Sequence, residues 1–195
     1  MRIIGDVHGH YSDYLDLISN RKSSVQVGDF GFDYDVLNHI DHNHHKIVGG
    51  NHDNYDIIKD CPHYLGDFGS ANVDGIKFFF IRGELSVDAH LRTEGINWWR
   101  EEELTITEGY AAIDAYDKAR PDFVISHGCP IRVMEEFITN PAKKINKSRT
   151  SQLLDSMFEI HKPKFWVFGH HHNSKTIKFD DCFFYCLNEL EFIDI

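Results

Sequence analysis

The chain has 195 residues, a length that fits one domain able to bury a sizeable core without disulfides. A hydrophobic fraction of 42% and a charged fraction of 26% are typical of a globular protein and exclude a disordered chain. The formal net charge of -11 disfavours binding along extended nucleic acid, which requires a basic surface for the phosphates.

The location expected for the chain is the cytoplasm, or the host cytoplasm if a phage encodes it. No stretch reaches the roughly 18 consecutive apolar residues of a membrane span. The segment Met1–Asp6 is too short and too soon acidic for a secretion signal. The four cysteines show no CxxC spacing, so we expect reduced thiols, with Cys182 and Cys186 in the core.

Short apolar runs alternate with amphipathic stretches along the chain. The runs are rich in Ile, Val and Phe and predict buried strands, whereas apolar residues at helical spacing predict helices. In chain order we expect a strand at 2–4, a helix at 11–19, strands at 24–27 and 46–48, a helix at 108–119, a strand at 123–126, a helix at 150–160 and a strand at 164–168. This alternation predicts an α/β fold with βαβ units and a largely parallel sheet that is covered on both faces.

Two predicted hairpins interrupt the alternation. Val73–Ile76 turns into a strand at Lys77–Ile81, and Phe179–Cys182 turns into a strand at Phe183–Leu187. We therefore expect a second, mixed sheet. No internal repeat or linker marks a boundary, so residues 1–195 are expected to form a single domain, with a possible cap or flap insert around residues 82–105.

Residue types that bind metals follow several of these strands. In open α/β sheets the carboxyl ends of the strands are where ligands bind. Asp, Asn and His side chains beside glycine turns are what a site for two divalent metals requires, and such mixed N and O donors suit Mn, Fe, Zn or Ni better than Ca or Mg. The motifs are Gly5-Asp6-Val7-His8-Gly9, Gly28-Asp29, Gly49-Gly50-Asn51-His52-Asp53, Ser126-His127-Gly128 and Gly169-His170-His171-His172, with Asn188 as a weaker sixth.

The spacing of the motifs suggests how the ions are held. The two-residue spacing of Asp6 and His8 lets one turn direct a carboxylate and an imidazole at one ion. A second carboxylate, Asp29, can bridge two ions about 3.5–4 Å apart, the separation used in in-line displacement at phosphorus. Neutral donors complete the two shells, namely Asn51, His127, His170 and His172.

The motifs resemble those of the calcineurin-like metallophosphoesterase superfamily. Its motifs read GD-x-HG, GD, GNH-[DE], H and GH-x-H, and all five occur here in that order between Gly5 and His172. The resemblance implies a four-layer α/β sandwich, in which two central, mostly parallel or mixed sheets carry a binuclear site along their edge. It implies two metal sites that share Asp29, one completed by Asp6, His8 and His172 and the other by Asn51, His127 and His170.

The function expected from this resemblance is metal-dependent hydrolysis of phosphomonoester or phosphodiester bonds, with hydroxide activated by two divalent ions. Manganese is the first choice of metal, with Fe, Zn or Ni as others. His52 is not assigned to a metal and is expected to protonate the leaving group, with Asp53 fixing its tautomer. The partner expected is a phosphorylated small molecule or nucleotide, with no membrane involved.

The motifs of this chain differ from those of some superfamily members in lacking two arginines. The superfamily's protein Ser/Thr phosphatases extend the second motif to GD-x-x-DRG and place Arg before GNHE, and both arginines are missing at Gly28–Asp33 and Gly49–Asp53. Because bidentate Arg suits a phosphate dianion, protein dephosphorylation is disfavoured unless Arg82 and Arg92 substitute. More loosely, Gly-Asp-Phe-Gly and the segments 82–88 and 98–102 resemble small phage and bacterial phosphoesterases.

Several alternatives stay open from the sequence. A protein phosphatase and a nuclease are the rival enzymes, and a metal-binding scaffold without turnover is the alternative outside enzymes. The retention of every expected ligand disfavours the scaffold. Four other features have both a structural and a functional interpretation, and the structural one is favoured except for Asn188, where the two are even. The cluster His39, His42, His44 and His45 is a loop or an adventitious metal site, and Trp98 and Trp99 anchor the insert or stack on a base. Cys129 packs or is redox-sensitive, and Asn188 is a turn residue or bonds to a ligand histidine.

Overall fold

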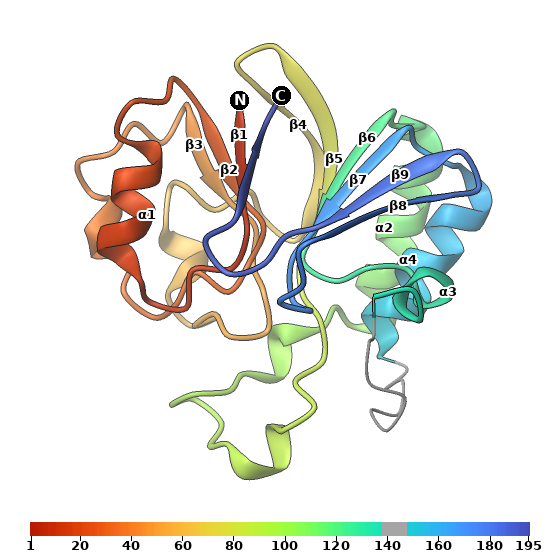
Figure 1. Cartoon of the computed structure of the whole chain (residues 1–195). Coiled ribbons are helices and arrows are strands. Elements are labelled where there is room, and N and C mark those ends of the chain that lie inside the picture. Colours follow the sequence, from red (N-terminus) through yellow and green to blue (C-terminus); the bar gives the residue numbers. More distant parts are fainter. Residues whose placement is uncertain (138–147) are drawn as a thin grey trace.

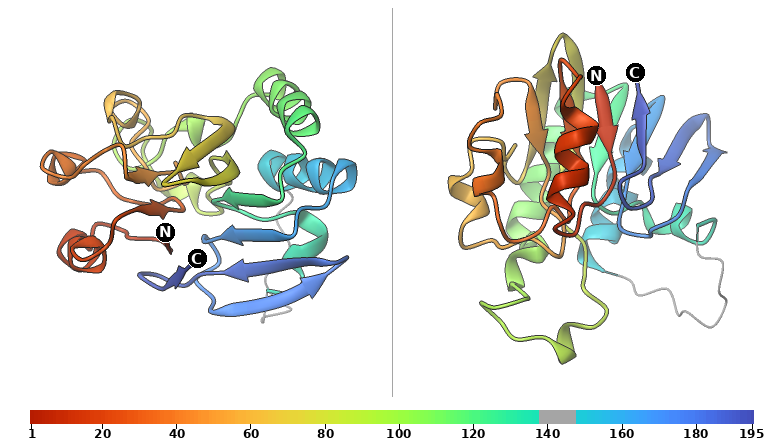
Figure 2. Two further views of the ribbon diagram at one scale, coloured as in Figure 1. Left: turned by 90° about the horizontal axis from the view of Figure 1, so that it is seen from above. Right: turned by 60° about the vertical axis from the view of Figure 1, so that its left-hand side comes forward.

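The structure, a computed structural model, describes residues 1–137 and 148–195. Two β-sheets pack face to face, and helices cover the outer face of each sheet (Figures 1 and 2). This four-layer α/β sandwich is the fold class that the sequence predicts. In the part of the chain that the structure describes, no helix is long and apolar enough to cross a membrane.

The first sheet has four strands in the order β10-β1-β2-β3. Strands β1, β2 and β3 run parallel to one another, and β10 pairs antiparallel with β1 at one edge. Helix α1 connects β1 to β2 and lies on the outer face. The elements are β1 (Arg2–Ile4), α1 (Tyr11–Ile18), β2 (Ser24–Gln26), β3 (His45–Ile47) and β10 (Phe192–Asp194), with two short 3₁₀ helices, η1 (Asp35–Leu37) and η2 (Ile58–Asp60).

The second sheet has six strands in the order β4-β5-β6-β7-β9-β8. The four central strands are parallel, and the two predicted hairpins add β4 and β8 as antiparallel edges, which makes the sheet mixed as expected. The elements are β4 (Phe68–Val73), β5 (Ile76–Ile81), α2 (Ile106–Ala119), β6 (Phe123–Ser126), α3 (Ile131–Met134), α4 (Arg149–Ile160), β7 (Phe165–Phe168), β8 (Lys175–Phe179) and β9 (Cys182–Cys186).

Three apolar clusters separate the four layers. Strand alternation explains them, because successive side chains of β6 point to opposite faces of the sheet. Val124 packs toward α2 and α4, whereas Phe123 and Ile125 pack between the two sheets. The third cluster joins the first sheet to α1 through Tyr14 and Ile18. All four cysteines are free thiols, and Cys182 and Cys186 are buried as predicted.

The predicted strands and helices are confirmed, with ends that shift by one or two residues. The start of α2 is the clearest shift, because the helix begins at Ile106 rather than at Glu108. Thr105 caps the helix: its hydroxyl accepts from the Glu108 backbone N–H, and the Glu108 carboxylate accepts from the Thr105 N–H. This capping box supplies partners for N–H groups of the first turn, which extends the helix toward its N-terminus.

Residues 82–105, which we call the flap, leave the second sheet after β5 and return to α2. The flap projects beyond the sheets in Figure 1 and contains only two short 3₁₀ helices, η3 (Ala89–Leu91) and η4 (Arg100–Glu102). Trp99 is 3% exposed and belongs to the cluster behind the first sheet, where its indole N–H donates to Asp56 over 2.8 Å. This supports the anchoring role for Trp99.

Candidate metal centre

The expected metal ligands converge because they follow strands of both sheets. Those of the first sheet follow β1, β2 and β3, and those of the second sheet follow β6 and β7, so the carboxyl ends of both sheets supply one site. Four of these residues have left-handed backbone, which is uncommon outside glycine and clusters at functional sites. They are His8 (φ 48°), Asp29 (φ 57°), His170 (φ 61°) and His172 (φ 46°).

One group of donor atoms comes from Asp6, His8, Asp29 and His172, and one atom from each lies within 4.8 Å of the others. The Nε2 atoms of His8 and His172 are 3.0 Å apart. His172 Nε2 is 3.0 Å from Asp6 Oδ2, and His8 Nε2 is 3.7 Å from Asp29 Oδ2. Two imidazole nitrogens and two carboxylates that face one another form a donor set that fits a divalent cation.

A second group lies on the other side of Asp29. The Asn51 side-chain oxygen is 2.9 Å from His127 Nε2 and 2.8 Å from His170 Nδ1. His127 Nε2 is also 3.2 Å from Asp29 Oδ1. The structure thus brings together Asn51, His127, His170 and one oxygen of Asp29, all of which were predicted to share one ion.

Asp29 lies between the two groups and turns a different oxygen to each. Its Oδ2 faces His8, whereas its Oδ1 faces His127 and accepts a hydrogen bond of 2.7 Å from the His52 backbone N–H. Burial raises the pKa of the Asp29 carboxyl, but His127 and the other nearby histidines outweigh burial and hold it well below its usual range. An ionised Asp29 carboxylate agrees with the bridging role expected from the sequence.

The charge and the close packing of both groups of donors fit divalent metal ions. Burial lowers the pKa of His127, but the charge of Asp29 and a hydrogen bond to it raise that pKa to about 10, so the centre favours a positive charge. Glycine lets the backbone come close to the carboxylates. A Cβ on Gly169 would lie 2.0 Å from Asp6 Oδ1, and one on Gly50 would lie 2.2 Å from Asp29 Oδ1.

Asp53 was expected to fix the tautomer of the His52 ring, and in the structure its carboxylate has other partners. Both oxygens of the buried Asp53 carboxylate accept hydrogen bonds, five in all, and none of these comes from the His52 ring. The donors are the backbone N–H groups of Asp29, Phe30, Gly31 and Gly50 and the hydroxyl of Tyr34. Asp53 therefore holds the loops after β2 and β3 together rather than fixing a tautomer.

Replacing Asp53 by asparagine is expected to destabilise the fold. The amide puts a donor where the carboxylate accepts, which leaves buried N–H groups without partners at a cost of roughly 3 kcal/mol. Thermal unfolding should show a Tm lower by roughly 6–12 °C. The exposed Asp60 is a matched control, since Asp60→Asn should leave the Tm unchanged. An unchanged Tm for Asp53→Asn would show that the five bonds do not stabilise the loops.

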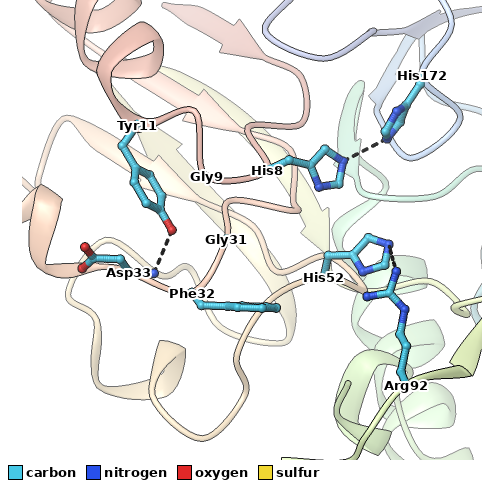
Figure 3. Close-up of a pocket in the computed structure, with 9 residues that line it drawn as sticks. All are labelled: His8, Gly9, Tyr11, Gly31, Phe32, Asp33, His52, Arg92 and His172. Atoms are coloured by element: carbon cyan, nitrogen blue, oxygen red, sulfur yellow. Dashed lines mark hydrogen bonds between the residues drawn. The ribbon is translucent and has the colours of Figure 1, made fainter. Parts of the chain in front are cut away.

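A pocket of about 610 Å³ opens beside the first group of donors. Figure 3 shows His8 and His172 on one side of it, and His52 and Arg92 on another. The remaining lining residues come from the loops after β1 and β2 and from the first residue of α1, and they are Gly9, Tyr11, Gly31, Phe32 and Asp33. The pocket therefore joins the candidate metal centre to the expected proton donor.

Of the two arginines expected to bind phosphate, the structure brings only Arg92 to this pocket. Arg82 is 3% exposed, forms a salt bridge with Asp67, donates to the Glu101 backbone carbonyl and lies over the Tyr55 ring. Its guanidinium is thus occupied in joining the base of the flap to the sheet. Local sequence does not distinguish the two, because both arginines lie in the same flap.

Arg92 contacts the expected proton donor directly. One of its terminal nitrogens lies 3.4 Å from His52 Nε2, and two of its nitrogens pair with the Asp88 carboxylate at 2.9 and 2.8 Å. A guanidinium only donates hydrogen bonds, so His52 Nε2 is an acceptor in this contact. Burial and the charge of Arg92 lower the pKa of His52, although Asp29 opposes them.

Sequence reasoning missed two residues beneath the centre. The Ser86 hydroxyl accepts from the Asn51 side-chain nitrogen over 3.1 Å, which turns the Asn51 oxygen toward the histidines. The Ser86 backbone N–H in turn donates to Glu102 over 3.0 Å. Ser86 is 4% and Glu102 2% exposed. The flap contains only two short 3₁₀ helices, so the burial of Ser86 follows no strand or helix periodicity and only the folded chain identifies it.

The histidine cluster at 39–45, Asn188 and Cys129 were each given a structural and a functional interpretation from the sequence. His45 contacts Ser24 and His63, and among the described residues the stretch 39–45 contributes to no group of metal-binding side chains. The Asn188 side chain accepts from the next backbone N–H, as a turn residue does. Cys129 is buried and lies 3.5 Å from His171.

Comparisons with known proteins come from sequence and from fold. The family model described as calcineurin-like phosphoesterase matches residues 2–174, which is most of the chain. No curated protein matches the sequence. Similar solved structures include phosphopantetheinyl hydrolase from Mycobacterium tuberculosis, with 15% identity, a TM-score of 0.51 and coverage of 96% of this chain and 89% of that one.

Two further structures are similar at lower scores. A predicted phosphoesterase from Streptococcus pneumoniae has 11% identity and a TM-score of 0.42, with 96% of this chain and 72% of that one covered. An archaeal phosphodiesterase has 16% identity and a TM-score of 0.42, with 97% and 84% covered. At these identities the likeness concerns the fold alone.

Proposed function

The chain belongs to the calcineurin-like phosphoesterase family, and from this premise we propose that it hydrolyses phosphomonoester or phosphodiester bonds with two divalent metal ions. The proposed substrates are small phosphorylated molecules or nucleotides. Manganese is the metal proposed first, because the mixed donor set of nitrogen and oxygen suits Mn, Fe, Zn or Ni.

The observation that carries this proposal is the position of Asp29 between two groups of donors. Asp6, His8 and His172 would complete one ion, and Asn51, His127 and His170 the other. A single structural ion would need only one of these groups. Two adjacent groups that share a carboxylate are the arrangement used for in-line displacement at phosphorus.

The residues around the pocket have distinct parts in the proposed reaction. When bound, the two ions lower the pKa of water toward neutrality and neutralise the phosphoryl oxygens. Arg92 would bind a phosphoryl oxygen, which is a better acceptor than the His52 ring. That exchange releases His52 Nε2, which can then bind a proton from solvent and donate it to the oxygen of the leaving group.

The test is metal analysis of the purified chain followed by parallel assays with Mn²⁺, Fe²⁺ and Ni²⁺. The substrates are p-nitrophenyl phosphate, its bis ester, cyclic nucleotides, nucleotides and single-stranded DNA. Hydrolysis that depends on the added metal, on the monoester or the diester, is the expected result. A protein that binds metal but hydrolyses none of these substrates would favour a scaffold without turnover.

Ser86→Ala is expected to weaken the metal group that contains Asn51. Without the hydroxyl the Asn51 amide loses the partner that orients its oxygen, and such supporting contacts are worth roughly 10- to 100-fold in metal affinity. Titration of Mn²⁺ into the metal-free chain, followed by calorimetry, measures the change. Ser70→Ala, at an exposed position of β4, is the control. Equal Mn²⁺ affinity in Ser86→Ala and the wild type would contradict the orienting role.

A further inference from the structure

Phe32 is an exposed aromatic side chain inside the pocket. It is 41% exposed, although most large aromatic side chains of the described chain are buried. Other exposed aromatics have surroundings that account for them or lie elsewhere: Phe165 stacks on Phe183, and Arg2 covers Phe192. Phe32 instead lines the pocket that also contains His52 and Arg92. Exposed apolar surface in such a place indicates a ligand.

The Phe32 ring is held in position before any ligand arrives. It packs edge to face with the Trp99 ring, with ring centroids 5.3 Å apart and planes at 66°. On either side of Phe32 the backbone is fixed, because the Gly31 N–H donates to Asp53 and the Asp33 N–H donates to the Tyr11 hydroxyl. A ring that is already ordered binds a ligand without the entropic cost of immobilising it.

The position of the ring relates it to the leaving group. Phe32, His52, Arg92, His8 and His172 line the same pocket, and in the view of Figure 3 Phe32 and Arg92 are drawn on opposite sides of His52. In the proposed reaction the phosphoryl group lies toward the histidines and Arg92. His52 protonates the leaving oxygen, so the rest of the leaving group extends past His52 to the loop that contains Phe32.

We propose that Phe32 forms a subsite for a planar aromatic leaving group, either the base of a nucleotide or an aryl ring, which stacks on its exposed face. This inference rests on the proposed function and narrows its substrates to aromatic phosphoesters. Stacking is tolerant of ring type, because every base and aryl group has a π-face. An aliphatic leaving group of the same charge gains nothing from the ring.

Binding of phosphonates tests the subsite without turnover, because their C–P bond is not hydrolysed. Calorimetry on the Mn²⁺-loaded chain compares phenylphosphonate and the 5′-methylenephosphonate analogue of AMP with methylphosphonate. Phe32→Ala should weaken both aromatic ligands by roughly 5- to 100-fold and leave methylphosphonate within about twofold. Phe32→Leu, which keeps an apolar side chain without a π-face, should resemble Phe32→Ala. The arm with the larger loss identifies a base or an aryl ring as the occupant.

The controls separate this inference from the proposed function. Tyr110→Ala removes an aromatic ring that is 68% exposed on α2, outside the pocket, and should change none of the affinities. Equal losses on aromatic and aliphatic ligands, or no loss on either aromatic ligand, would overturn the subsite. Metal-dependent ester hydrolysis by the wild type would still stand in that case. Selective loss of aromatic binding in a chain without turnover would keep the subsite and refute the enzyme.

Discussion

Asp29→Asn is expected to abolish both the metal content and the turnover of the proposed enzyme. Asp29 faces both groups of donors, with Oδ2 toward His8 and Oδ1 toward His127. An amide offers one neutral oxygen in place of two anionic ones, so it cannot bridge. Elemental analysis should show fewer than one ion per chain, and kcat/KM should fall by roughly 10³-fold or more, in keeping with the several kcal/mol that metal ions supply.

The control for this substitution is Asp114→Asn, which removes an exposed carboxylate on α2 at no cost to the pocket. Its metal content and kcat/KM should equal those of the wild type. Asp29→Asn is expected to fold, because Asp53 also holds the loop of Asp29. A near-ultraviolet circular dichroism spectrum verifies this. A folded Asp29→Asn with full metal content and full turnover would show that Asp29 does not bridge.

His52→Ala is expected to slow hydrolysis according to the leaving group. An alkoxide leaves poorly without a proton, so esters of aliphatic alcohols should lose roughly 10²- to 10⁴-fold in kcat. A p-nitrophenolate ion leaves without protonation, so p-nitrophenyl phosphate should lose less than about tenfold. Steady-state kinetics on glycerol phosphate and p-nitrophenyl phosphate measure the two effects on one preparation.

The matched control is His90→Ala, because His90 is an exposed histidine of the flap outside the pocket. It should change neither kcat. Metal content is measured alongside, because the His52 ring lies next to that of His8, with centroids 5.6 Å apart. Losses of equal size on both esters, at unchanged metal content, would refute His52 as the proton donor and would indicate instead a role in binding the phosphoryl group.

The fold and the identity of the candidate ligands follow from local sequence. Each motif combines a buried strand, a glycine turn and a candidate ligand within a few residues, so a short stretch of sequence is enough to predict all three. Asp6 follows β1 and Asp29 follows β2, and parallel strands bring such residues to one edge of a sheet. The order of the motifs was sufficient to identify the family, because five independent patterns coincide.

The roles of individual side chains depend on contacts between segments that are distant in the sequence. Asp53 adjoins His52 in sequence, yet its carboxylate is surrounded by N–H groups of the loop after β2. Arg82 and Arg92 both lie in the flap, and only the packing of the flap places one on Asp67 and the other at the pocket. The charged end of a long side chain pairs with the opposite charges that lie near it in the folded chain, and the local spacing of residues in the sequence does not predict those partners.

By itself, the sequence determined the family, the layers of the fold and the set of candidate ligands, because these depend on strand periodicity and on residue type. Only the tertiary structure decided that Ser86 supports Asn51, that Asp53 holds loops and that Phe32 faces the pocket. Those outcomes depend on hydrogen bonds and packing between segments that lie far apart along the chain, and their geometry exists only after the two sheets have packed together.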